Sequence, residues 1–142
     1  METGCDYCFH VESDFTFNDR IPVGWMQKIL EARPYLAQVA LKRQPWNDAE
    51  KAAGGIIEQA PENYEEHESV AGKWTEHDVC FTTNPSLYSR SIVEKGWPDG
   101  PESEGVFSHQ LRQGGYRFAY LGGKFDPPRV THIGTHRTGN GY

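Results

Sequence analysis

The segment from Tyr7 to Phe17 alternates between apolar and polar residues, and this pattern constrains the fold more than any other part of the sequence. With the exception of Ser13, its odd positions are aromatic or aliphatic: Tyr7, Phe9, Val11, Phe15 and Phe17. Its even positions are polar: Cys8, His10, Glu12, Asp14 and Thr16. Because successive side chains of a strand point to opposite faces, the alternation predicts a half-buried strand. Its polar face carries a thiol, an imidazole and two carboxylates, the groups of a metal site or a catalytic site.

Length and composition indicate one folded domain that spans residues 1–142. A chain of 142 residues buries most of its apolar surface without help from a metal or a disulfide. An aromatic content of 13% argues against disorder. The sequence has three cysteines and no apolar run long enough for a signal peptide or a membrane span. These features predict a cytoplasmic protein without membrane contact, whose thiols are free or bound to metal.

The formal net charge of −6 disfavours non-specific binding to nucleic acid. The charge is unevenly distributed, because residues 104–142 contain five arginines and lysines and only two acidic residues. The same segment holds His109, His132 and His136. An anionic ligand is therefore expected at this basic end rather than at the acidic remainder of the chain.

Apolar residues at helical spacing predict helices in the first half of the chain. Trp25, Met26, Ile29 and Leu30 begin a stripe that predicts one kinked helix or two short ones over residues 22–44, with the break at Pro34. Asn47 offers a cap for a further amphipathic helix. The acidic residues of the segment 58–68 predict an exposed helix or loop.

The second half is predicted to contain most of the strands. Residues 79–82 read as a short strand, and residues 83–96 as a capped helix. Glycine and proline in the segment 97–103 predict a loop that serves as a mobile flap. Hydrophobic runs separated by turn residues predict a β-meander with strands at 106–111, 116–121 and 130–137, followed by a frayed tail.

Together these elements predict an α+β fold. Its antiparallel sheet would combine the N-terminal strand, the strand at 79–82 and the C-terminal β-meander. The helices within residues 22–59 would pack on one face of this sheet. The opposite face would display Cys8, His10 and, depending on register, a histidine-bearing strand.

Four residues have the chemistry and spacing of zinc ligands. Cys5-x-x-Cys8 and His77-x-x-Cys80 together use every cysteine of the chain. Tetrahedral zinc prefers such nitrogen and sulfur donors. His10 lies on the same predicted strand face as Cys8 and could replace His77. The sequence thus indicates zinc as a possible cofactor.

The histidines of the last predicted strand indicate a catalytic site. His132 and His136 are four residues apart and therefore share a strand face. Imidazole titrates near neutral pH, so these two residues and His10 are the candidate catalytic groups. Arginine binds phosphate bidentately. The candidate ligand-binding residues are His109, Arg117, Arg129 and Arg137. This set predicts an enzyme or sensor for a phosphate-containing small molecule such as a nucleotide.

The tryptophans support a different class of function. Trp46, Trp74 and Trp97 each fall at a predicted loop or element boundary, and exposed aromatic residues anchor protein interfaces. They predict a small binding protein, an inhibitor or an adaptor, that acts on a protein partner. Because the sequence contains no complete catalytic motif, this hypothesis is preferred to the enzyme or sensor.

Overall fold

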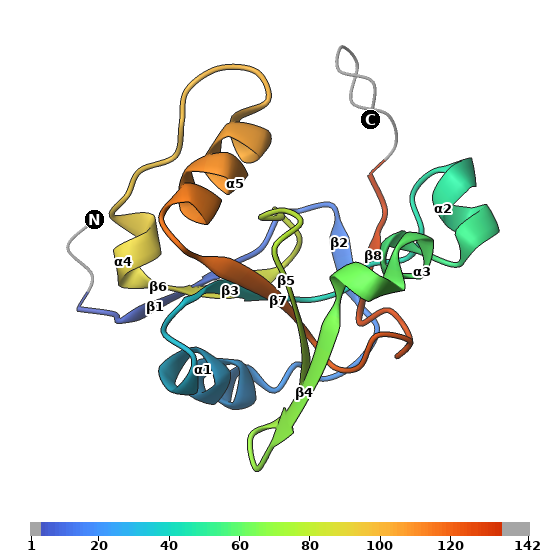
Figure 1. Cartoon of the computed structure of the whole chain (residues 1–142), viewed down its shortest axis with the longest axis horizontal. Coiled ribbons are helices and arrows are strands. Elements are labelled where there is room, and N and C mark those ends of the chain that lie inside the picture. Colours follow the sequence, from blue (N-terminus) through green and yellow to red (C-terminus); the bar gives the residue numbers. More distant parts are fainter. Residues whose placement is uncertain (1–3, 135–142) are drawn as a thin grey trace.

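A six-stranded mixed sheet organises the chain in the computed structural model, which describes residues 4–134 (Figure 1). Its strands are ordered β1-β6-β3-β7-β5-β4, and a separate two-stranded sheet pairs β2 with β8. The strands are β1 (Tyr7–His10), β2 (Phe15–Phe17), β3 (Leu36–Ala40), β4 (Glu65–Ser69), β5 (Gly72–His77), β6 (Ser86–Ser89), β7 (Arg117–Leu121) and β8 (Val130–His132). The helices are α1 (Val23–Ala32), α2 (Asp48–Ala53), α3 (Ile56–Gln59), η1 (Pro61–Asn63), α4 (Arg90–Val93) and α5 (Ser103–Gln113).

The α+β class predicted from the sequence is confirmed, and the sheet topology differs from the predicted one. Only β3 and β7 run parallel, whereas every other pair in the large sheet is antiparallel. Of the three predicted C-terminal strands, only β7 joins the large sheet. β8 pairs with β2 instead, so the C-terminal third is not a meander.

Helices cover both faces of the large sheet, which corrects the prediction that they pack on one. Residues paired across neighbouring strands point to the same face. On one face, Val39 and Leu87 pack against Met26 and Ile29 of α1. On the other face, Phe118 of β7 packs against α5. In Figure 1, α1 accordingly lies below the sheet and α5 above it.

The alternating segment at the N-terminus forms two strands rather than one. β1 pairs with β6 and β2 pairs with β8, so the chain passes from one sheet to the other between them. Phe9 and Phe15 pack against the core as predicted. Val11 and Phe17 are 47% and 44% exposed, because they lie where the segment leaves the large sheet and at the end of β2. The alternation therefore predicted local extended structure correctly, but it overestimated how many of the apolar residues are buried.

Three strands occupy segments predicted as helix or loop. β3 lies within the predicted helix 22–44 and β6 within the predicted helix 83–96, and β4 overlaps the end of the acidic segment 58–68. All of β3 is buried, and a short, fully buried apolar run cannot be distinguished from a helix by periodicity alone. β4 is an edge strand, where charged side chains discourage pairing with another chain. A fourth strand, β5, lies where no element was predicted.

Two predicted strands are absent from the described part of the chain. The segment 79–82 is a loop, and the predicted strand at 106–111 lies inside α5. Phe107, Ser108 and Leu111 are the buried residues of α5, and their spacing is helical. The last predicted strand, 130–137, is observed as β8 over Val130–His132. Its residues 135–137, like the tail that follows, lie outside the described residues.

His77 of β5 is buried among aromatic rings on the α5 face of the sheet. Its ring centroid lies 5.0 Å from that of Tyr64, 5.1 Å from that of Tyr120 and 5.7 Å from that of Phe118. Burial lowers the pKa of His77 from 6.5 to about 4, and the positive charge of Arg117 acts in the same direction. The folded protein therefore holds this imidazole neutral at pH values at which the unfolded chain protonates it.

We predict that acid destabilises the fold through His77. Its contribution to stability is present above pH 6.5 and is lost as the pH falls, because only the unfolded state takes up the proton. Between pH 6.5 and 5 the loss is about 1.5 kcal/mol. Urea unfolding at several pH values measures it. His77→Gln should flatten this part of the profile, and His109→Gln, an exposed histidine of α5, should not. An unchanged profile in His77→Gln would contradict the prediction.

Candidate functional site

A cavity of about 740 Å³ opens where the two sheets meet the loop that precedes α5. Sites for small molecules have volumes of roughly 300–1,000 Å³. β1 ends at His10, which pairs with Ser86 at the start of β6, and Ser86 pairs with Ala40 at the end of β3. Beyond this row the chain leaves the sheet in several directions, and the loops that result surround the cavity. β2 and β8 lie side by side and supply another wall (Figure 1).

His132 and Asp14 form a hydrogen-bonded pair in this wall. Nε2 of His132 lies 3.0 Å from Oδ2 of Asp14. A carboxylate accepts hydrogen bonds and does not donate them, so Nε2 carries the hydrogen. Within residues 4–134, Nδ1 of His132 is buried without a hydrogen-bond partner, as is Oδ1 of Asp14. The pair therefore contains an imidazole nitrogen whose lone pair is unpaired and covered by neighbouring groups.

Both the backbone and the ring of His132 are held in place. The backbone N–H of His132 donates to Oε1 of Gln44 (2.9 Å), and the His132 carbonyl accepts from Nε2 of the same glutamine (2.8 Å). The rings of Trp46 and Phe15 meet the imidazole edge-to-face, with centroid distances of 4.6 and 4.9 Å. These contacts leave the imidazole little freedom to rotate, which fixes the direction of its nitrogens.

The approach of Asp14 to His132 depends on Gly134. A Cβ atom at position 134 would lie 2.8 Å from Oδ2 of Asp14 and 3.0 Å from Cε1 of His132. Such contacts would force the pair apart. The short distance between Asp14 and His132 therefore requires a glycine at position 134. The reason is the space that a Cβ would occupy and not the backbone φ of Gly134.

A second glutamine fixes the wall formed by residues 81–84. Gln38 of β3 is fully buried. Its Nε2 donates to the carbonyl of Thr82 (3.0 Å), and its Oε1 accepts from the backbone N–H of Thr82 (2.8 Å). Gln38 and Gln44 thus each bind both backbone groups of one cavity residue. Two parts of the cavity wall are therefore held by glutamine side chains that lie in β3 or shortly after it.

His10 and Tyr88 line the cavity from neighbouring strands of the large sheet. Nε2 of His10 is buried and has no hydrogen-bond partner among the described residues; Oε1 of Glu12 is 4.0 Å away, too far for a hydrogen bond. Burial raises the pKa of Tyr88 to about 12, and the neighbouring Cys8 contributes to this shift. The Tyr88 hydroxyl is protonated at neutral pH, as an ordinary tyrosine also is, and it is hydrogen-bonded to the Cys8 side chain.

The structure brings together two of the three predicted catalytic histidines. His10 and His132 line the same cavity, whereas His136 lies outside the described residues. The predicted ligand-binding set is not assembled: His109 is exposed on α5, and Arg129 does not line the cavity. Arg137 lies outside the described range.

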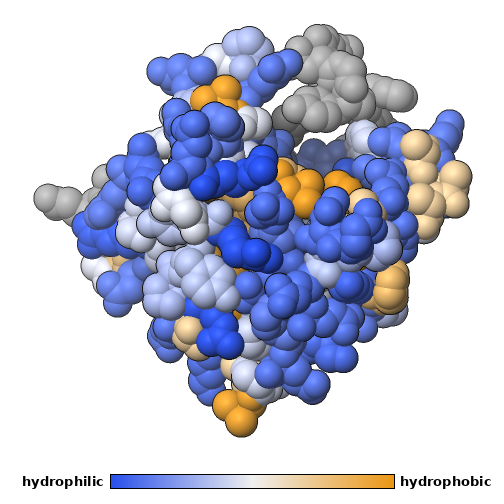
Figure 2. Space-filling view, in the orientation of Figure 1, coloured by the Kyte–Doolittle hydropathy of each residue, from blue (hydrophilic) through white to orange (hydrophobic). Residues whose placement is uncertain are grey.

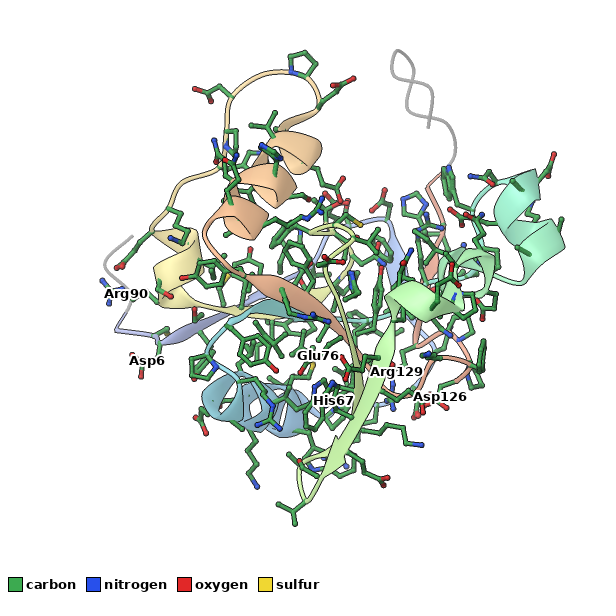
Figure 3. The ribbon with its side chains drawn as sticks, in the orientation of Figure 1. Asp6, His67, Glu76, Arg90, Asp126 and Arg129 are labelled. Carbon is green, nitrogen blue, oxygen red and sulfur yellow. The ribbon has the colours of Figure 1, made fainter. Side chains whose placement is uncertain are left out.

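The predicted ligand-binding residue Arg117 belongs to a different cluster, around the buried carboxylate of Glu76. Nε of Arg117 lies 3.8 Å from Oε2 of Glu76. Trp74 and Tyr35 donate hydrogen bonds of 2.9 Å to the same carboxylate. Figure 3 shows His67 of β4 beside Glu76 of β5, on neighbouring strands. A buried charge needs such partners. The role of Arg117 in this structure is therefore to balance the charge of Glu76.

The four predicted zinc ligands are not brought together. Cys8 is in β1 and His77 is in β5, and β6, β3 and β7 lie between them. Four strand spacings amount to about 19 Å. Cys5 is exposed, and burial raises the pKa of the Cys80 thiol to about 11. Across residues 4–134 the structure contains no group of three or more metal-binding side chains placed to hold an ion.

Several cavity residues were missed or assigned another role by sequence reasoning. Trp46 and Trp97 line the cavity, whereas Trp74 is a core residue that is 1% exposed. Arg43 gave no sequence signal, because its place in the wall depends on where β3 ends. Asp14 and Glu12 did give one, since both belong to the polar positions of the alternating segment.

Comparison with known proteins gives no relative: no family model, no curated protein and no solved structure matches this chain. In the part of the chain that the structure describes, none of the helices has the length and apolar character needed to span a membrane.

The geometry predicts the tautomer of His132. In ¹⁵N-labelled protein near pH 7.5, long-range ¹H–¹⁵N correlation spectra should show a protonated Nε2 and an unprotonated Nδ1. Asp14→Asn should alter this pattern, because an amide can donate a hydrogen bond to the ring. Glu12→Gln removes another carboxylate of the cavity and should leave the pattern unchanged. A protonated Nδ1 in the parent protein would contradict the assignment.

Proposed function

We propose that this protein is an enzyme that binds a small molecule in the 740 Å³ cavity and uses His132 as a general base. The observation that carries the proposal is the unpartnered, buried Nδ1 of an imidazole whose Nε2 is bound to Asp14. A carboxylate that fixes the tautomer and orientation of a histidine is a recurring device of proton-transfer catalysis.

In the proposed step, the groups that cover the buried Nδ1 of His132 move aside, and Nδ1 accepts a proton from a water molecule or a substrate hydroxyl. The oxygen that loses this proton forms a bond to the substrate centre that it attacks, and the bond from that centre to the leaving group breaks. The resulting imidazolium is stabilised by the carboxylate of Asp14, 3.0 Å away. The proton then passes from Nδ1 to the leaving group, which restores the neutral imidazole. The Tyr88 hydroxyl would donate to a substrate oxygen after leaving its hydrogen bond to Cys8.

The placement of the tryptophans supports a cavity-based function over a protein-binding surface. Of the three expected to anchor a partner, Trp74 is buried in the core, and Trp46 and Trp97 line the cavity, where Trp97 is 48% exposed. On the face shown in Figure 2, hydrophobic residues are scattered among hydrophilic ones and do not form one broad patch. A large contiguous apolar patch would have marked a site of protein–protein interaction.

Activity can be tested before the substrate is identified. Purified protein is incubated with a small-molecule extract, and mass spectrometry records which compounds are consumed. We expect His132→Gln and Asp14→Asn to slow consumption by about 10²–10⁴-fold, the contribution of a positioned general base. His109→Gln is the matched control and should be fully active. Circular dichroism establishes that the variants are folded. Equal consumption by the parent and by His132→Gln, or none by the parent, would refute the proposal.

A further inference from the structure

A second cavity, of about 400 Å³, lies between the segment that follows β3, the helices α2 and α3, and the loop that follows β7. Its volume falls within the range of small-molecule sites, roughly 300–1,000 Å³. It shares Thr82 and Asn84 with the wall of the first cavity. Asp14 and His132 are not part of its lining, so the proposed catalytic pair belongs to the first cavity alone.

The amine of Lys42 is incompletely paired at this second cavity. The side chain is 12% exposed, and it leaves the chain two residues after the end of β3. Its Nζ donates one hydrogen bond, of 2.9 Å, to the carbonyl of Lys124. Oε1 of Glu58 is 4.0 Å away, too far for a hydrogen bond. Since an ammonium group has three N–H donors, the charged form of Lys42 lacks protein acceptors within residues 4–134.

The carboxylate of Glu58 is incompletely paired as well. Its Oε2 is buried and has no hydrogen-bond partner among the described residues. Gly55 leaves the space that this oxygen fills, because a Cβ atom at position 55 would collide with it. Buried polar atoms are nearly always hydrogen-bonded in folded proteins. The cavity thus places an amine and a carboxylate 4.0 Å apart, each with unused capacity for a further partner.

The surroundings of Lys42 favour its neutral, nucleophilic form. Burial lowers the pKa of Lys42 from its ordinary value of 10.5, although the carboxylates of Glu58, from α3, and Asp126, from the loop after β7, act in the opposite direction. At a given pH a larger fraction of this lysine is therefore neutral than of an exposed one. A neutral amine in a cavity is the form that attacks carbonyl carbons.

We propose that Lys42 binds a small aldehyde covalently in this second cavity, as an imine. The lone pair of Nζ forms a bond to the carbonyl carbon, and the π bond of the carbonyl opens. The nitrogen then loses its two protons, and the former carbonyl oxygen gains two protons and leaves as water. The atoms balance without any oxidant or reductant. Glu58 is placed to accept a proton from the nitrogen and to return it to the departing oxygen.

The product fits the groups that surround Nζ. A protonated imine has one N–H, which can keep the hydrogen bond that the amine donates to the Lys124 carbonyl. Its positive charge faces the carboxylate of Glu58. Ile56, Phe125 and Pro127 add apolar side chains to the lining. They favour an aldehyde with a short apolar chain over one that carries a second charge.

Reductive trapping tests the proposal. Butanal and sodium cyanoborohydride, which reduces an imine to a stable amine, are added to the folded protein at pH 7. Peptide mass spectrometry then records the rate at which each lysine gains a butyl group. We expect Lys42 to be labelled several-fold faster than the lysines that are exposed, Lys28, Lys51, Lys73 and Lys95. The difference should shrink at pH 10, where a larger share of the exposed amines is neutral.

Two matched variants assign the early reaction to one amine. Lys42→Arg keeps the positive charge and removes the nucleophile, so it should abolish the fast phase of butyl incorporation. Lys51→Arg is the control. Lys51 also has a carboxylate beside it, with Nζ 3.7 Å from Oδ1 of Asp48, but its side chain is 62% exposed. This variant should retain the fast phase. Circular dichroism establishes that both variants are folded.

The outcomes separate this inference from the proposed function. Labelling of Lys42 at the rate of the exposed lysines or more slowly, or a fast phase that persists in Lys42→Arg, overturns the imine site, even if His132 proves necessary for activity. His132→Gln should label Lys42 at the parental rate. Selective labelling of Lys42 in a protein that consumes no compound supports the imine site and refutes the catalytic proposal.

Discussion

The pairing of β2 with β8 is the interaction on which the candidate site depends. Phe15 pairs with His132, and the backbone N–H of Ile133 donates to the carbonyl of Asp14 at 2.8 Å. These contacts join positions near the two ends of the described chain. Because the backbone is fixed on both sides, the Asp14 carboxylate and the His132 imidazole meet at hydrogen-bond distance without relying on flexible loops. The missing side chain at Gly134 leaves the space that this approach requires.

The large sheet supports this site through its interior polar residues. Gln38 projects from β3, the fully buried strand near the middle of the sheet, and binds both backbone groups of Thr82. Gln44, shortly after the same strand ends, does the same for His132. Buried amides must satisfy both donor and acceptor, as Gln38 does; Gln38 thereby ties the loop residue Thr82 to β3, and the half-buried Gln44 ties the strand residue His132 to the segment that follows β3. The cavity is therefore pre-formed to a degree that its loop composition alone does not suggest.

Local patterns predicted some elements well and others poorly, and the difference has a physical origin. β1 and α1 were recognisable, because in each the residues that pack against the core alternate with polar residues at the spacing of the element. β3 was mistaken for helix because both of its faces are buried, so its residues show no strand alternation. Part of α5 was mistaken for a strand. One reason is that Val106 is apolar although it is 44% exposed, so the apolar residues of this segment do not all lie on the buried face of the helix. Similarly, Trp74 and Trp97 were both predicted to lie at element boundaries. Their tertiary contacts place Trp74 in the core and Trp97 in the cavity wall.

The sequence by itself determined that the chain folds as an α+β protein. It also indicated the polar positions of the segment 7–17 and the histidines His132 and His136 as candidate site residues, since composition and alternation are properties of neighbouring residues. Tertiary structure decided which of them meet. It joined Asp14 to His132, placed His10 in the same cavity, and distributed the predicted zinc ligands and arginines elsewhere. Convergence of side chains depends on strand order and register, which arise from contacts between distant segments and leave no periodic trace in the sequence.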